Sequence, residues 1–177
     1  TSSLGVLTPD GFAMGANGAV GVLLFGGDGF EIAAASAEIE PGCSGAGKVA
    51  ATRLREQLTG SPSMLMMFGV PGCEEGLLDG VAEVFPDVPL IGGSAADHAI
   101  AGDWSVIHND GVSSSAIALV ALGSEIHVGT SYLAPYRLRG EVQATVTSVE
   151  GRRVMELDGQ PAAAVLREWV GPDIEGQ

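Results

Sequence analysis

Length, composition and charge exclude several classes of protein. The chain has 177 residues, and its 22 acidic and 8 basic residues give a formal net charge of −14 at pH 7. A chain of this length suits one domain that buries roughly 70% of the surface exposed when it is unfolded. The negative charge repels nucleic-acid phosphates and anionic lipids, no apolar run approaches the roughly 20 residues of a membrane span, and residues 1–12 lack a signal-peptide pattern. We therefore expect a cytoplasmic protein that binds neither nucleic acid nor membranes.

The first half of the chain alternates between strand and helix patterns. Apolar or alternating runs predict strands at residues 19–25, 30–39, 63–70 and 88–91. The first two strands are expected to pair as a hairpin through the glycine-rich turn 26–29. Amphipathic patterns predict helices at residues 44–58, with Ser44 as the N-cap, and at residues 74–85. Strands and helices in this order favour parallel pairing of the strands.

The second half has the pattern of antiparallel strands. Strands are expected at residues 104–108, 113–122, 126–133, 142–149 and 152–157. The sequence Asn109-Asp110-Gly111 predicts a tight hairpin turn. Pro161 is well placed to begin a last helix that ends at Gly171. The sequence thus predicts one mixed α/β (α+β) domain over residues 1–177, with largely antiparallel sheets, three flanking helices and parallel pairing in the first half.

The leading candidate site directly follows the predicted strand 88–91. Its sequence is Gly92-Gly93-Ser94-Ala95-Ala96-Asp97-His98. Glycines let the backbone approach a ligand closely, and N–H groups near Gly93 and Ser94 would hold an anionic or carbonyl group. Asp97 would bind an amine, and His98 would donate, accept or ligate. The alternative is a tight turn in which these side chains only bond to the backbone.

A second candidate site is the basic segment Tyr136-Arg137-Leu138-Arg139. It holds two of the eight basic residues of a very acidic chain. Arg137 and Arg139 would clamp a carboxylate with paired hydrogen bonds, beside Tyr136. The alternative is that the two arginines only relieve acidic repulsion at the surface.

Three residues are candidate nucleophiles: Ser94, Cys43 and Thr1. Cys43 and Cys73 each precede a predicted helix, whose dipole would stabilise a thiolate, although small buried cysteines are often structural. Two cysteines make no disulfide framework and, with three histidines, no structural zinc site, so we expect reduced thiols and no metal. A chain-terminal Thr1 would use its own amine as the base for its hydroxyl.

Four segments in order resemble one known family. They are residues 88–97, the hairpin around 109–111, residues 146–151 and residues 156–162. Together they resemble the N-terminal FIST domain, of the F-box and intracellular signal transduction family. The resemblance implies a cytoplasmic sensory domain that binds small ligands such as amino acids. It also implies that N-terminal elements and a C-terminal FIST lobe are missing here, so a second lobe, a signalling partner or an oligomer would complete the assembly.

The same resemblance raises a cofactor alternative. Some proteins with FIST domains look like haem-binding nitric-oxide sensors, in which one histidine holds the iron. His98, on the predicted loop, suits that role better than His108 or His127, which fall on or beside strands. Aromatic residues make up only 5% of the chain, which leaves little to stack on a porphyrin. We expect no cofactor, with haem on His98 as the alternative.

The sequence therefore supports one leading function and one rival. The leading function is a small-molecule-binding sensory domain for signal transduction, whose ligand is an amino acid or small carboxylate. The rival is a hydrolase of a small carbonyl compound, with Ser94, Cys43 or Thr1 as the nucleophile and His98 or Asp97 as the base. A sensor releases its ligand unchanged, whereas an enzyme converts it.

Overall fold

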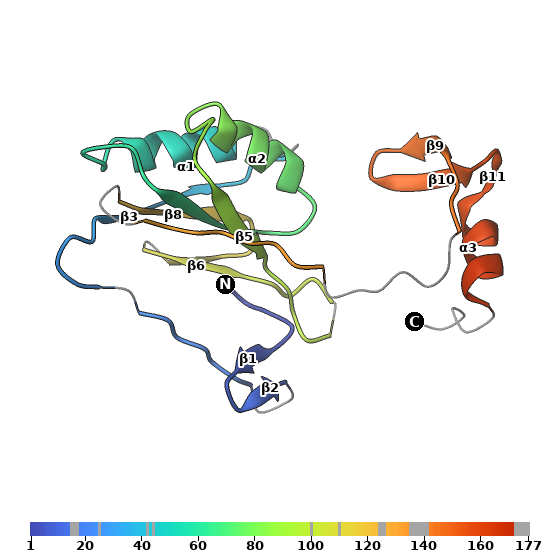
Figure 1. The fold of residues 1–177 in the computed structure, drawn as a ribbon, viewed down its shortest axis with the longest axis horizontal. Coiled ribbons are helices and arrows are strands. Elements are labelled where there is room, and N and C mark those ends of the chain that lie inside the picture. Colours follow the sequence, from blue (N-terminus) through green and yellow to red (C-terminus); the bar gives the residue numbers. More distant parts are fainter. Residues whose placement is uncertain are drawn as a thin grey trace. The chain divides into compact units, whose positions relative to one another are not determined.

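The computed structural model describes residues 1–14, 18–24, 26–41, 43, 45–99, 101–109, 111–123, 127–134 and 142–171. The chain divides into two compact units, Thr1–Ser131 and Tyr132–Gln177 (Figure 1). Both units combine helices and strands, which confirms the predicted mixed α/β class. The predictions made for Ser44, Asp110, Tyr136, Arg137 and Arg139 lie outside the described residues.

A four-stranded sheet forms the centre of the first unit. Its strands lie in the order β3 (Ile32–Glu38), β8 (Ala116–Leu122), β4 (Met64–Gly69) and β5 (Leu90–Ser94). β4 and β5 are parallel, as predicted, whereas β8 is antiparallel to both of its neighbours. β3 and β4 therefore point the same way but do not pair, because β8 lies between them. An apolar strand that is almost wholly buried suits this central place.

The predicted hairpin of residues 19–25 and 30–39 is wrong. Residues 18–24 form no strand, and β3 pairs instead with β8, so that Ala35 lies opposite Leu119. Val20 and Leu24 are 89% and 87% exposed, so their apolar pattern contributes no core here. The strand predicted at 126–133 is also wrong for its described part, since residues 127–133 form none. A local apolar pattern does not reveal a partner that lies far away in the chain.

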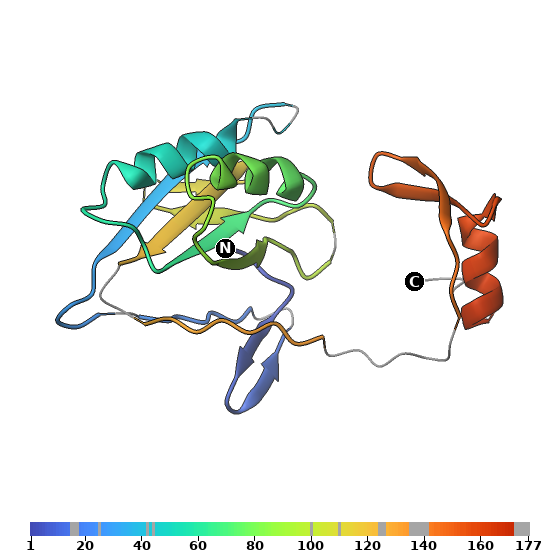
Figure 2. The ribbon, with the colours of Figure 1, turned by 45° about the horizontal axis from the view of Figure 1, so that its top comes forward.

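Two helices cover one face of this sheet (Figure 2). They are α1 (Ala46–Arg55) and α2 (Glu74–Ala82), which confirms both predicted helices, although each ends three residues before its predicted end. Leu54 of α1 and Leu77 of α2 are fully buried in the core. No helix in the described ranges has both the length and the apolar character needed to cross a bilayer.

Glycines allow α1 and α2 to approach each other closely. A Cβ atom added at Gly47 would lie 2.1 Å from the carbonyl oxygen of Leu77. One added at Gly80 would lie 2.6 Å from the backbone nitrogen of Lys48. Both contacts are with backbone atoms, which cannot move aside as a flexible side chain can. The two helices therefore pack backbone against backbone.

Gly47→Ala is expected to destabilise the protein by about 1–3 kcal/mol, because overpacking outweighs the gain of about 1 kcal/mol that Ala gives in a helix. Urea unfolding followed by circular dichroism measures the change. Gly26→Ala is the control, because a Cβ atom there would meet nothing within 4 Å. Equal unfolding midpoints for Gly47→Ala and the wild type would contradict the close packing.

Two short hairpins also lie among the described residues of the first unit. β6 (Val106–His108) and β7 (Gly111–Ser113) form the hairpin that Asn109-Asp110-Gly111 predicts, with His108 opposite Gly111. The strand predicted at 113–122 is thus two strands, since β7 ends at Ser113 and β8 begins at Ala116. The hairpin of β1 (Val6–Thr8) and β2 (Gly11–Ala13) is not predicted by the sequence pattern.

The described part of the second unit, residues 132–134 and 142–171, contains three antiparallel strands and one helix. They are β9 (Val146–Glu150), β10 (Arg153–Leu157), β11 (Gln160–Pro161) and α3 (Ala162–Val170). The predicted turn at Glu150-Gly151 and the predicted helix end at Gly171 are both confirmed. Pro161 is the N-cap of α3 rather than its first residue.

Candidate functional site

The glycines of the predicted loop belong to a strand. Gly92, Gly93 and Ser94 are the last residues of β5, which corrects the prediction of a loop directly after residue 91. Gly92 has φ +149°, and a Cβ atom there would lie 1.8 Å from the carbonyl oxygen of Met67 on β4. This glycine is therefore required by the pairing of β5 with β4. A Cβ atom at Gly93, by contrast, would meet nothing within 4 Å.

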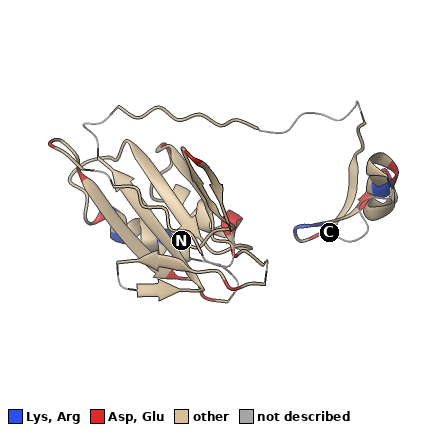
Figure 3. Ribbon diagram, turned by 90° about the horizontal axis from the view of Figure 1, so that it is seen from below, with Lys and Arg blue, Asp and Glu red and all other residues tan. Residues whose placement is uncertain are grey.

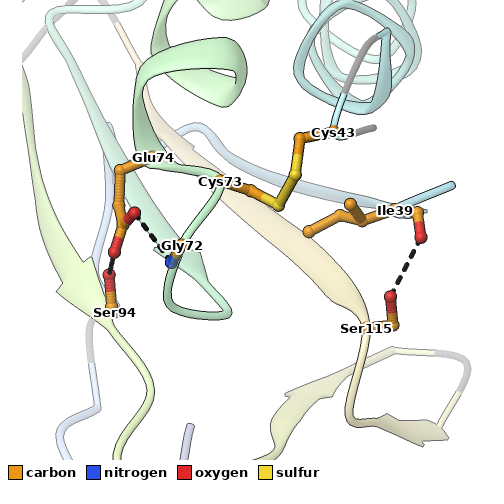
Figure 4. Close-up of a disulfide and its surroundings, with 7 residues drawn as sticks. All are labelled: Ile39, Cys43, Gly72, Cys73, Glu74, Ser94 and Ser115. Atoms are coloured by element: carbon orange, nitrogen blue, oxygen red, sulfur yellow. Dashed lines mark hydrogen bonds between the residues drawn. A yellow bond between two sulfur atoms is a disulfide. The ribbon is translucent and has the colours of Figure 1, made fainter. Parts of the chain in front are cut away.

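Ser94 bonds to a carboxylate at the start of α2. Its Oγ donates to Glu74 Oε1 at 2.7 Å, and the N–H of Gly72 donates to Glu74 Oε2 at 2.9 Å (Figure 4). Glu74 thus links the carboxyl ends of the parallel strands β4 and β5, the usual place for sites in such sheets. Sequence reasoning missed Glu74 as a partner of Ser94. The available signal was a carboxylate in the first turn of a helix that follows a strand. The favourable interaction of a carboxylate with the helix dipole also explains a glutamate at this position.

Asp97 organises the turn that follows β5. Its side chain is 8% exposed and accepts four backbone N–H bonds of 2.8–3.0 Å, from Ala99, Ala101, Gly102 and Asp103. These bonds, led by that from Ala101, lower the pKa of Asp97 from 3.8 to about 2, although burial opposes the shift. The carboxylate that was expected to bind a ligand amine therefore binds its own chain. Ala95 is also internal, since its buried N–H donates to Gly69 O at 2.7 Å.

His98 and Thr1 line a different part of the molecule from Ser94. Exposed His98 borders a cavity of about 600 Å³, with Thr1, Ile107 and the β1–β2 region. Thr1 Oγ1 bonds to the carbonyl oxygens of Ser2 and Ser105 at 3.3 and 3.4 Å. The hydroxyl of Ser94 instead bonds to Glu74, so a nucleophilic serine here would have Glu74 beside it.

The two cysteines form a disulfide. Cys43 and Cys73 lie 30 residues apart in sequence, and their Cα atoms are 5.4 Å apart (Figure 4). This corrects the expectation of two reduced thiols, and Cys43 in this state has no thiolate with which to act as a nucleophile. The close packing of α1 and α2 brings the residues before the two helices together, a contact that cysteine spacing alone does not reveal.

A cavity of about 770 Å³ lies where β3, α1 and β6 meet. Ser36 of β3 is central to its polar side: Ser36 Oγ lies 3.1 Å from His108 Nδ1. Arg53 Nη1 donates to the carbonyl oxygen of Ser36 at 2.7 Å, and Gln57 Nε2 donates to that of Ala34 at 3.1 Å. Arg53 is in the last turn of α1 and Gln57 lies in the turn that follows the helix, so both reach the sheet edge from the C-terminal end of α1.

Charge and apolar surface meet in this cavity. Phe68, Ile107 and Val120 give it apolar walls, and Glu56 adds a carboxylate near the polar groups. Every basic residue of Thr1–Ser131 belongs to α1 (Figure 3): Lys48, Arg53 and Arg55. An anionic group approaching this acidic unit would therefore be attracted chiefly to α1.

Sequence reasoning did not predict this cavity, because its residues come from three separated segments. One signal was present, a single serine within the apolar strand Ile32–Glu38. The arrangement can bind a small molecule that carries charge at one end and apolar surface at the other.

Comparisons with known proteins agree with the resemblance of the motifs. The FIST N domain family matches residues 1–160. No curated protein matches the chain.

Proposed function

We propose a sensory function from one established premise: the chain belongs to the FIST N domain family, a family of sensory domains in signal transduction. The chain binds a small molecule in the cytoplasm and passes the signal to a second FIST lobe or to a partner protein. The ligand is an amino acid or a small carboxylate.

The cavity beside Ser36 is the observation that carries this proposal. A guanidinium has five N–H donors, so Arg53 has donors for a ligand carboxylate besides the one that bonds Ser36. His108 would add a further polar contact, and Glu56 would face a ligand ammonium group. Phe68 and Val120 would pack against an apolar side chain. Both signs of charge and an apolar wall match the parts of an amino acid.

The cavity is favoured over residues 92–98 as the ligand site. Ser94 and Asp97 already bond to protein groups, and Gly92 is required by strand pairing. Gly93 and His98 retain exposed surface, so they would contribute only to a ligand that extends beyond the cavity. Tyr136, Arg137 and Arg139 stay a sequence prediction for carboxylate binding.

A thermal-shift screen with amino acids and small carboxylates tests the proposal. A ligand present at 100 times its Kd stabilises the protein by about 2.7 kcal/mol, so a clear rise in Tm is expected for one group of related compounds. Recovery of the compound unchanged would support a sensor, whereas its conversion would favour the hydrolase. No rise in Tm across the panel would count against ligand binding.

Arg53→Gln is expected to weaken binding of the best compound about 10-fold or more, because a hydrogen bond to a charged group contributes roughly 1.5–3 kcal/mol. Isothermal titration calorimetry measures the change in Kd. Arg55→Gln is the matched control, since Arg55 lies on the same helix but contacts the ring of Phe85 instead of the cavity. Equal losses of affinity in both variants would mean that only the general charge of α1 matters.

A further inference from the structure

The disulfide between Cys43 and Cys73 joins two partly exposed residues. Both cysteines are half-buried at the surface end of the α1–α2 pair, and Cys73 is the N-cap residue of α2. Beside them, Cβ atoms added at Gly72 and Gly45 would meet nothing within 4 Å. The backbone at these two glycines therefore borders open space.

The packing of α1 against α2 does not depend on this bond. Leu54, Leu77 and Val81 are at most 2% exposed and belong to the core that holds both helices to the sheet. Gly47 and Gly80 add the close backbone contacts described above. We therefore expect the unit to stay folded when the bond is broken. A reversible redox site requires a fold that survives reduction.

The two cysteines occupy different backbone positions. Cys43 has φ +60°, in the left-handed region that is unfavourable for a residue other than glycine, so its surroundings hold it there. Cys73 precedes the first turn of α2, where backbone N–H groups and the helix dipole would stabilise a thiolate. Glu74 and Glu75 in the same turn oppose this stabilisation, and Cys43 likewise precedes a helix, so either cysteine can leave first.

We propose that Cys43 and Cys73 form a reversible redox site that exchanges with thiols of the glutathione class. A thiolate of the reductant attacks the Sγ atom of one cysteine, forms a mixed disulfide with it and releases the other cysteine as a thiolate, which takes up a proton. A second reductant thiolate then attacks the glutathione sulfur of this mixed disulfide. Oxidised glutathione forms, and the remaining cysteine is released as a thiolate that takes up a proton. Two electrons and two protons reach the protein, and oxidised glutathione reverses both steps.

This site goes beyond ligand binding but fits the compartment proposed above. Disulfides of cytoplasmic proteins are usually transient and redox-sensing, whereas those of secreted proteins are structural. The reversible role thus rests on the proposed cytoplasmic placement. Its test needs no ligand, so a failure here and a failure of ligand binding are distinguishable.

The folded protein is equilibrated in glutathione buffers with an increasing ratio of reduced to oxidised form. It is then quenched with N-ethylmaleimide and weighed by intact mass spectrometry. We expect a change from no adduct to two adducts within the series, while circular dichroism keeps the folded signal. Reduction should lower Tm by about 10 °C, because opening a 30-residue loop restores chain entropy to the unfolded state, and oxidised glutathione should restore Tm.

The double variant Cys43→Ser/Cys73→Ser is the control. Its Tm should equal that of the reduced wild type and should not change with the ratio of reduced to oxidised glutathione. Absence of adducts across the whole series would overturn the proposal, because the bond would then be inert in the folded protein. Unfolding upon reduction would overturn it too, as would two thiols that stay unpaired in oxidised glutathione.

Discussion

Gly92→Ala is expected to lower the stability of the protein by about 3 kcal/mol or more, a large part of the 5–15 kcal/mol typical of a folded domain. The new Cβ atom would lie 1.8 Å from the carbonyl oxygen of Met67, and φ +149° is unfavourable for any residue but glycine. Neither strand can move away without losing the pairing of β4 with β5. Thermal unfolding by circular dichroism should show a fall in Tm of roughly 10 °C.

Gly93→Ala, one residue further along β5, is the matched control. A Cβ atom there would meet nothing within 4 Å, so its stability should stay within about 0.5 kcal/mol of the wild type. If both variants lost the same stability, strand approach would not explain Gly92. If Gly93→Ala kept its Tm but lost the ligand, residues 92–98 would be part of the binding site after all.

Asp97→Asn is expected to cause the second large loss of stability, with Tm lower by several degrees at neutral pH. The wild-type carboxylate accepts four hydrogen bonds from backbone N–H groups. An asparagine side chain would place its NH₂ group, which is itself a donor, against some of these N–H groups, so some of the bonds would be lost. Asp103→Asn is the control, because the Asp103 side chain is exposed while its backbone N–H keeps the bond. Equal Tm values for the two variants would contradict the role of the Asp97 carboxylate.

The pH dependence gives an independent check on Asp97. Its pKa is lowered from 3.8 to about 2 in the folded protein, so the unfolded chain takes up the proton first as the pH falls. The stability from this carboxylate is therefore fully present above about pH 4 and is lost as the pH falls toward 2. The difference in urea midpoint between the wild type and Asp97→Asn should narrow over that window. A difference that stays constant down to pH 2 would contradict the lowered pKa.

Local sequence patterns predicted those elements whose cause is local. The helices at Ala46–Arg55 and Glu74–Ala82, the strand Met64–Gly69 and the hairpin before Gly111 all follow from apolar periodicity, helix ends and turn residues. The partner of β3 was not predictable in this way. Residues 19–25 have as strong a strand pattern as β8, and only long-range packing decides between them.

The candidate site was harder to predict than the fold for the same reason. Ligand binding by Gly92 and Asp97 stays a prediction; in the fold, Gly92 lies against Met67 O, and Asp97 accepts N–H bonds of the following turn, neither of which a local motif reveals. Ser36, Arg53 and His108 come from three separate elements, so no short motif contains them. The Cys43–Cys73 pairing likewise depends on how two helices pack.

The central claim is that a small molecule binds in the cavity beside Ser36. The most direct test is a ¹⁵N-labelled NMR titration with the compound that raises Tm most. We predict that the backbone signals of Ser36, Arg53 and His108 shift in proportion to ligand occupancy, while those of Gly93 and Ser94 stay in place. Shifts that gather at residues 92–98 and leave Ser36 unchanged would contradict the account.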